Sequence, residues 1–180
     1  MARLASVIPP ENVFGVSSHL ATADFNEFFT PNFLPVWNNP YYLCASHLIE
    51  NLCRVMLTRE HPTKIDFIFD RQGKIGRNFK LVYDAALKPM SLFLFPFMGD
   101  CRHEDKREFV PLQAADMNAA WTRRRQSTIQ LWTAADPYLA NLEQFNFKIK
   151  RPWLERLASY RKEHAAEITA YWERMIGDGQ

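Results

Sequence analysis

The chain has 180 residues, 47% of them hydrophobic and 23% charged, a composition that fits one soluble globular domain. Its net charge of +2 does not by itself predict a nucleic-acid partner, because partners respond to clustered charge. Cys44, Cys53 and Cys101 match neither a disulfide framework nor a zinc motif, so we expect reduced thiols in a cytoplasmic protein. We predict no signal peptide and no membrane span, because the most apolar stretch, 90–98, is short and contains Pro96.

Periodicity and turn residues predict an alternation of helices and strands along the chain. A strand is expected over 13–20, a short helix over 22–29 and a proline-rich loop over 30–40. The apolar stripe over 41–57 predicts a helix, and the strand 64–70 follows it. The remaining predicted elements are a loop with Gly73 and Gly76, a helix over 77–87, a strand over 91–97, a charged loop over 99–108, a helix from Pro111 to about 132 and an amphipathic helix over 152–175.

This alternation favours parallel strands joined by crossover helices. We therefore predict an α/β fold in a single domain, 1–180, with a core over 13–130 and a C-terminal helix over 150–176. In such folds the functional residues lie at the carboxyl ends of the strands.

Asp70 is the first candidate for chemistry, because it ends a hydrophobic strand and so lies at the carboxyl edge of the predicted sheet. The alternative is that Asp70 only starts a turn, since Asp-Arg-Gln-Gly is a typical turn sequence. Position alone leaves both interpretations open.

Asp116 is the second candidate and the more informative carboxylate. On a helix starting near Pro111 it falls about 40° from Leu112, so we expect it on the face that packs against the sheet. Burying an ionised carboxylate without a partner is costly, so a divalent cation or an arginine should satisfy it. Arg123 lies two turns along the same face, which leaves a structural salt bridge open as the alternative.

Two carboxylates from a strand end and a facing helix would form a site of hard oxygen ligands. Mg²⁺ or Mn²⁺ suits such a site, with water and substrate phosphate completing the octahedron. Two such ions can activate water and stabilise the leaving oxygen in phosphodiester hydrolysis.

The segment FVPLQAADMNAAWTRRR resembles the C-terminal box of the domain of unknown function 3800 family, which typically shows a Leu-Gln-x-Ala-Asp motif opening a helix of small residues. The strand in FIFDRQGK resembles that family's middle acidic position, and the resemblance covers about 13–130. The family is similar to ribonuclease H-like proteins, which implies a mixed sheet flanked by helices and metal-dependent nucleic-acid cleavage. The resemblance implies that Asp70 and Asp116 are catalytic metal ligands and that Gln113 belongs to the motif helix.

The N-terminal end departs from the family pattern. The family usually opens with a strand bearing Asp-Glu-Ser, whereas Glu11 is the only carboxylate in 1–23 and follows two prolines. We therefore expect this first strand to be shortened, replaced or lost, which would leave two carboxylates where the superfamily uses three or four.

Two other carboxylates are candidates to complete the metal site. Asp100 follows the predicted strand 91–97 and is the preferred third ligand, because it should lie near a sheet edge. Glu50 ranks below it, since its helical angle points it towards solvent. We interpret His47 and His103 as ordinary surface or half-buried histidines.

Basic residues gather near the same predicted edge. Arg123, Arg124 and Arg125, with Lys106 and Arg107, are candidates for contact with nucleic-acid phosphates. The alternative is a solvated helix end, where cations favour the helix dipole. We assign the aromatic stripe of the C-terminal helix to packing or to a homodimer interface.

Three hypotheses follow from the sequence. The first is a metal-dependent, nuclease-like protein with an incomplete acidic site. The second is a non-catalytic relative that binds nucleic acid or protein. The third is an α/β domain of unrelated function in which Asp116 pairs with Arg123.

Overall fold

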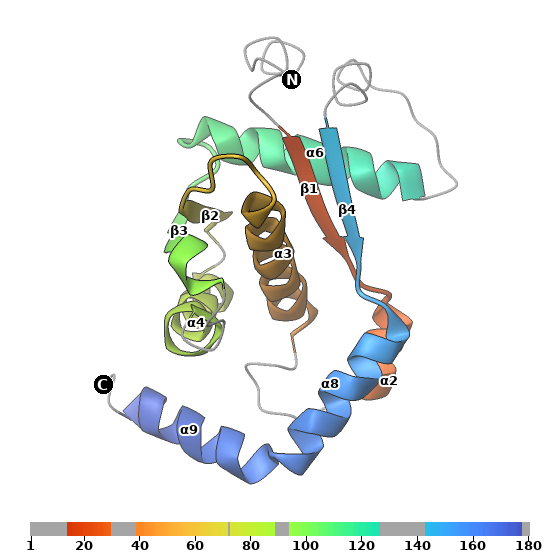
Figure 1. Ribbon diagram of the computed structural model, residues 1–180, viewed down its shortest axis with the longest axis vertical. Coiled ribbons are helices and arrows are strands. Elements are labelled where there is room, and N and C mark those ends of the chain that lie inside the picture. The colour runs from red at the N-terminus through yellow and green to blue at the C-terminus, as the bar shows by residue number, and fades with distance from the viewer. Residues whose placement is uncertain (1–13, 30–38, 72, 89–93, 127–142, 178–180) are drawn as a thin grey trace.

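The part of the chain that the structure describes folds into six α-helices and two parallel two-stranded sheets. The structure is a computed structural model, and it describes residues 14–29, 39–71, 73–88, 94–126 and 143–177. The helices are α2 (Thr22–Phe28), α3 (Pro40–Leu57), α4 (Gly73–Val82), α6 (Val110–Gln126), α8 (Arg151–Glu163) and α9 (Ala165–Gly177). The strands are β1 (Phe14–His19), β2 (Ile65–Asp70), β3 (Met98–Glu104) and β4 (Glu143–Lys148). In Figure 1, α6 crosses one end of the molecule, while α8 and α9 form a bent arm at the other.

The strands β2 and β3 form the sheet that positions the candidate site. They pair in parallel, with Ile65 opposite Met98 and Asp70 opposite Glu104, and the register shifts once near the start of β2. The helix α4 lies between them in the chain and contacts β3. The predicted crossover from one parallel strand to the next is therefore confirmed for this pair.

The strand β3 lies later in the chain than predicted. The prediction placed a strand over 91–97 and an exposed charged loop after it, but 91–93 lie outside the described residues and Phe95–Phe97 form a short 3-10 helix. The strand runs through the charged segment instead. Its side chains alternate, with Cys101 buried and Asp100 and Arg102 exposed, as expected for a half-buried strand. The high charge of the outward face hid this alternation.

The helix α4 begins earlier than predicted, because both glycines expected in the preceding loop belong to it. Gly73 opens the helix with a positive φ of 54°, and Gly76 is buried where the helix meets β3. The helix continues through a π-helical turn, Tyr83–Leu87, which ends at the predicted residue. Glycine is tolerated inside this helix because it allows close contact with the sheet.

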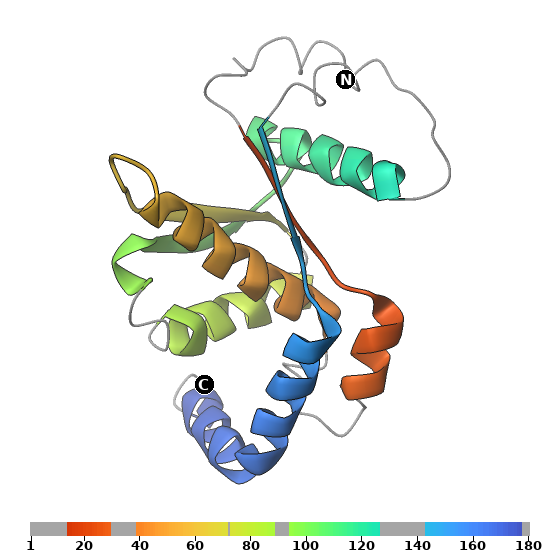
Figure 2. The same cartoon turned by 45° about the vertical axis from the view of Figure 1, so that its right-hand side comes forward.

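The strands β1 and β4 form the second sheet and come from opposite ends of the described chain. They pair in parallel from Phe14 opposite Glu143 to His19 opposite Lys148. The strand β1 agrees with the prediction, but β4 was not predicted. Figure 2 shows this pair extended between α6 and α8. The described strands thus form two separate pairs, whereas the sequence predicted one mixed sheet.

The main hydrophobic core lies between α3, α4 and the sheet of β2 and β3. The predicted apolar stripe of α3 supplies one side of it, with Ile49 and Cys53 fully buried. The core cluster comprises Tyr42, Ala45, Ile49, Cys53, Phe67, Phe79, Tyr83, Leu87, Leu94, Met98 and Cys101. Burial of this apolar area is the main contribution to the stability of the fold.

A smaller cluster joins α2, the start of α3 and α8. It consists of Phe25, Phe29, Leu43, Ile149 and Leu154. Leu154 is fully buried and anchors α8 against the rest of the molecule. The C-terminal arm is thus attached to the fold chiefly through its first helix.

The C-terminal segment is two helices, whereas the sequence predicted one. The break falls at His164, which ends α8 with non-helical φ and ψ values of −106° and 20°. The His164 Nδ1 atom lies 2.8 Å from the Tyr160 carbonyl oxygen, and the two rings stack with centroids 4.2 Å apart. The bend between the two helices therefore coincides with a ring that folds back onto the last turn of α8.

Candidate functional site

The candidate site lies at the carboxyl edge of β2 and β3. Asp70 is the last residue of β2 and lies beside Glu104, the last residue of β3. The Arg71 amide donates a hydrogen bond of 2.9 Å to the Glu104 carbonyl oxygen, which extends the pairing by one residue. The position predicted for Asp70 is confirmed.

A tight turn after β3 carries the next charged residue of the site. The Asp105 carboxylate accepts a 2.9 Å hydrogen bond from the Arg107 amide, and its carbonyl oxygen accepts one of the same length from the Phe109 amide. Arg107 also forms an ion pair with the Asp105 side chain, which holds the pKa of Asp105 well below its usual range. This turn places Lys106 between the sheet edge and the first turns of α6.

Lys106 connects the two predicted metal ligands. Its Nζ atom lies 3.0 Å from Asp116 Oδ2 and 3.7 Å from Asp70 Oδ2. The hydrogen bond to Asp116 and the charges of both carboxylates raise the pKa of Lys106. The structure therefore brings Asp70 and Asp116 to one place, as predicted, with an ammonium group shared between them.

Asp116 is exposed, which corrects the prediction that it faces the sheet. Its side chain keeps 56% of its surface accessible, and its ion-pair partner is Lys106, whereas the sequence left a divalent cation or Arg123 open as the partner. The buried positions of α6 include Leu112 and Thr122. Alanines occur on several sides of this helix, so the sequence has little hydrophobic contrast from which to choose the buried face.

Two other predicted residues on α6, Gln113 and Arg123, form no hydrogen bond or ion pair with Asp70 or Asp116 in the described part of the structure. Gln113 is half-buried in the first turns of the helix, and Arg123 is exposed two turns beyond Asp116. The side chains of Arg124 and Arg125 lie outside the described part of the structure. The predicted contact of these arginines with nucleic acid stays a prediction.

Asp100 is not part of this edge. It lies near the start of β3, where its amide donates a 2.9 Å hydrogen bond to Asp66 Oδ1, at the opposite end of the sheet from Asp70. Four residues of a strand separate Asp66 from Asp70, a distance of about 13 Å. Lys80 Nζ lies 3.7 Å from Asp100 Oδ1 and 2.8 Å from Asp84 Oδ2. Asp100 therefore lies too far away to be the third ligand.

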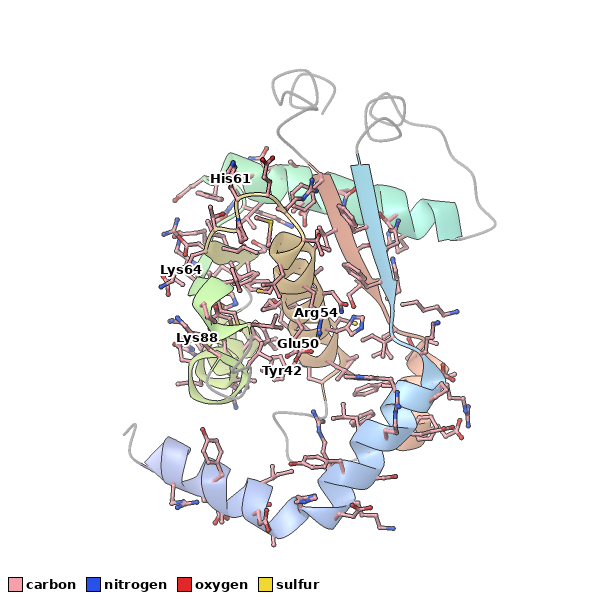
Figure 3. All side chains as sticks on the ribbon, viewed as in Figure 1. Tyr42, Glu50, Arg54, His61, Lys64 and Lys88 are labelled. Carbon is pink, nitrogen blue, oxygen red and sulfur yellow. The ribbon has the colours of Figure 1, made fainter. Side chains whose placement is uncertain are left out.

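Glu50 is half-buried, which corrects the prediction that it faces solvent. Burial raises the pKa of its carboxyl group, and the nearby charge of Arg54 partly offsets that effect. Figure 3 shows the two side chains close together along α3. Glu50 is on a different element from the acidic edge, and no contact joins it to Asp70 or Asp116.

His47 and His103 are half-buried, in agreement with the prediction of surface or half-buried histidines. The His103 ring stacks on Phe69, and burial lowers the pKa of His103. His47 Nδ1 lies 2.9 Å from Ser18 Oγ, and its ring meets Phe147 and Trp153 edge to face. Burial lowers the pKa of His47 as well. Both rings therefore pack against aromatic side chains at the edge of the core.

Sequence reasoning missed the role of Lys106, which it assigned to phosphate contact. A usable signal was present, because Lys106 follows the end of a strand and precedes a helix that carries a carboxylate. The carboxyl ends of parallel strands lie at the same edge of a sheet. A residue that follows one strand therefore lies near the last residue of the neighbouring strand. The position of Lys106 became clear only once β3 was seen to run through the charged segment as far as Glu104.

The donor set at the edge fits a hard divalent cation. Mg²⁺ is commonly bound through one or two carboxylates, with water and substrate phosphate as the other ligands, and Asp70 and Asp116 supply two. Among the described residues, no group of three or more histidine, cysteine, aspartate or glutamate side chains is arranged to hold a metal ion. The edge therefore supplies two carboxylates and, among the described residues, no third protein ligand arranged with them.

Within the described part of the chain, no helix combines the length and apolarity needed to cross a lipid bilayer. The chain matches no protein-family model, no curated protein and no solved structure. The resemblance to the domain of unknown function 3800 family therefore stays a prediction, and the geometry of the edge is the basis for assigning a function.

Proposed function

We propose that this chain is a ribonuclease H-like protein whose Asp70–Asp116 pair holds Mg²⁺ or Mn²⁺ and supports phosphodiester hydrolysis. The observation that carries the proposal is the convergence of the two carboxylates on one ammonium group. These two residues come from a strand end and a separate helix, the positions implied by the resemblance.

Each group at the edge has a defined role in this proposal. Asp70 and Asp116 would hold the ion through their carboxylate oxygens, and the ion would supply an activated water and charge neutralisation for a phosphodiester. Asp70 is the less exposed of the two, with 30% of its side chain accessible, so it is the more rigidly held ligand. The exposure of Asp116 leaves room for a polymeric substrate to approach.

A calorimetric Mn²⁺ titration tests this proposal. Wild-type protein should bind Mn²⁺, and Asp70→Asn and Asp116→Asn should each abolish or greatly weaken that binding. Asp100→Asn is the matched control, because Asp100 is also an exposed carboxylate beside a lysine but lies at the opposite end of the sheet. Equal binding by the wild type and Asp116→Asn would refute the assignment.

A second candidate function is a non-catalytic module that binds nucleic acid or protein. The observation that favours it is that Lys106 already pairs with both carboxylates, at 3.0 Å from Asp116 Oδ2 and 3.7 Å from Asp70 Oδ2. Under this alternative the wild type binds no Mn²⁺, while exposed cations such as Arg123 contact phosphate. A salt-dependent affinity for single- or double-stranded DNA or RNA, weakened by Arg123→Gln and independent of Mn²⁺, would support it.

We also propose that the chain forms a homodimer through its C-terminal arm, which consists of α8 and α9. The arm is joined to the fold through α8, and Figures 1 and 2 show α9 beyond it at the end of the molecule. Tyr160 exposes 51% of its surface near the bend of the arm. Light scattering should detect a dimer in the wild type and a monomer in Tyr160→Glu, and a monomeric wild type would exclude this interface.

A further inference from the structure

The C-terminal arm bends at a single residue, His164. Residues 153–176 contain no glycine or proline, and good helix formers recur through them, so the sequence supports one continuous helix. In the structure α8 ends before His164, whose φ of −106° and ψ of 20° are not helical, and α9 begins directly after it. Figure 1 shows the two helices meeting at an angle. The bend therefore needs a cause other than a helix-breaking residue.

The side chain of His164 folds back onto the last turn of α8. Its Nδ1 atom lies 2.8 Å from the Tyr160 carbonyl oxygen, which also accepts a 3.0 Å hydrogen bond from the His164 amide. The imidazole stacks on the Tyr160 ring, with centroids 4.2 Å apart and 24° between the planes. A side chain that competes for a backbone carbonyl is a known cause of helix kinks. This contact thus favours the bent form of the arm over the continuous one.

The strength of the contact depends on the protons of the imidazole. A carbonyl oxygen only accepts, so the Nδ1 atom must carry a hydrogen. A neutral imidazole carries one hydrogen on either nitrogen, whereas the imidazolium carries a hydrogen on both and always donates. Its positive charge also interacts favourably with the carbonyl end of α8 and with the face of the Tyr160 ring. Protonation therefore stabilises the bent form.

The charged groups near this imidazole leave the effect of its protonation intact. Glu163 and Glu167 are exposed carboxylates on either side of the bend, and they attract the imidazolium in the bent and the continuous form alike. The Arg161 guanidinium carbon lies 5.4 Å from the centre of the Phe29 ring, so this buried cation is directed towards the smaller hydrophobic cluster. Lys162 is exposed two residues before the bend, a spacing at which helical side chains do not face each other.

We propose that His164 is a pH-sensitive hinge: the protonated imidazole holds the bend, and its deprotonation releases α9 towards a continuous helix with α8. Histidine is the side chain whose ordinary titration falls between pH 5 and 8. Among the described elements, α8 is the one with which α9 makes its main contact, so α9 can move as a unit. The bend belongs to a single chain, so it can be tested apart from the proposed dimer and from the acidic edge.

Double electron–electron resonance measures the bend as a distance between two spin labels. One label is attached through Arg156→Cys on α8 and the other through Arg174→Cys on α9, both at exposed positions. These positions lie about 27 Å apart along a continuous helix and closer together in a bent arm. An excess of unlabelled protein removes distances between two chains of a dimer. The protein without the added cysteines, treated in the same way, measures any labelling of the native thiols.

In this labelled protein we expect the shorter distance to dominate at pH 5. The ratio of bent to continuous arms should fall roughly five- to thirtyfold between pH 5 and pH 8. An added His164→Ala should give the longer distance at both pH values. An added His164→Asn should keep the shorter distance at both, because its amide donates to the carbonyl but does not titrate. An added His61→Ala, which removes an exposed histidine outside the arm, should leave the pH response unchanged.

Three results would overturn the hinge. A distance that stays the same between pH 5 and pH 8 would show that protonation does not control the bend. A His164→Ala arm that remains bent would show that packing sets the angle instead. A His164→Asn arm that still responds to pH would mean that the titrating group lies elsewhere. Circular dichroism at both pH values shows whether each variant is folded, so that a change in distance reports on the arm and not on unfolding.

Discussion

Gly76 of α4 lies directly against the imidazole ring of His103 on β3. A Cβ atom at Gly76 would fall 2.7 Å from His103 Cδ2 and 2.9 Å from its Nε2, closer than real side-chain carbons approach. The ring cannot readily move away, because it stacks on Phe69. This contact sets how closely α4 packs on the sheet that carries Asp70.

Gly76→Ala should therefore destabilise the protein. Alanine favours a helix over glycine by about 1 kcal/mol, whereas overpacking typically costs about 1–3 kcal/mol, so the clash should prevail. In the background of His103→Ala the clash is removed, and the same substitution should become neutral or stabilising. Guanidinium unfolding of the four proteins measures this cycle. A stabilising Gly76→Ala in the wild-type background would contradict the packing described.

Glu50→Gln should stabilise the protein at neutral pH. Burial raises the pKa of Glu50 in the folded state above its usual value of 4.5, so the unfolded chain releases this proton more readily. Stability is therefore lost as the pH rises through 4.5 and towards the folded-state pKa. Glutamine carries no charge and avoids this loss.

The pH dependence of the free energy of unfolding tests the Glu50 prediction. The difference between Glu50→Gln and the wild type should be positive at pH 7 and should vanish below pH 4.5, where both forms are neutral. Glu60→Gln is the control, because Glu60 is exposed after the end of α3. A gain that persists unchanged at acidic pH would show that burial of the charge is not its cause.

The thiols should be unreactive in the folded protein. Burial raises the pKa of Cys53 to about 11 and that of Cys101 to about 12, and it also raises the pKa of the half-buried Cys44. The thiolate is the reactive form, so few molecules carry one at pH 8. Ellman's reagent should label none of the three rapidly under native conditions and all three in guanidinium. Rapid labelling of Cys53 or Cys101 in the native state would contradict their burial.

Arg151→Gln should loosen the attachment of the C-terminal arm. The Arg151 guanidinium pairs with both carboxylate oxygens of Glu27 and lies 3.5 Å from Asp24 Oδ1, so it ties α8 to α2. It also lies 4.9 Å from the centre of the Phe28 ring. The substitution should lower the melting temperature at low salt, and the loss should shrink at high salt because these groups are exposed.

Arg156→Gln on the same helix is the matched control for the arm. Arg156 is also exposed, and among the described residues it forms no ion pair with a carboxylate of α2. Its substitution should therefore barely change the melting temperature. Limited proteolysis gives an independent measure of the arm. Cleavage near the start of α8 should be faster in Arg151→Gln than in Arg156→Gln, and equal rates would exclude the proposed clamp.

Local patterns in the sequence predicted those elements whose residues carry a strong hydrophobic signal. The apolar stripe of α3 and the strand β2 ending in Asp70 were placed from short-range periodicity, and the helix bearing Asp116 from Pro111 at its first turn. Their positions depend on side chains within a few residues of each other, so the sequence contains the required information. The sequence also predicted that Asp70 and Asp116 lie close together, and in the structure both contact Lys106.

Tertiary structure alone decided how these elements face one another. The sequence of β3 carries charges on every second residue, and only its pairing with β2 shows that the other face is buried. The strand β4 pairs with β1 across most of the chain, a contact that no local pattern records. The alanine-rich surface of α6 allowed more than one buried face, so packing set its rotation and left Asp116 exposed beside Lys106. Periodicity determines where a helix or strand forms, but long-range contacts determine which of its faces is buried and which charges meet there.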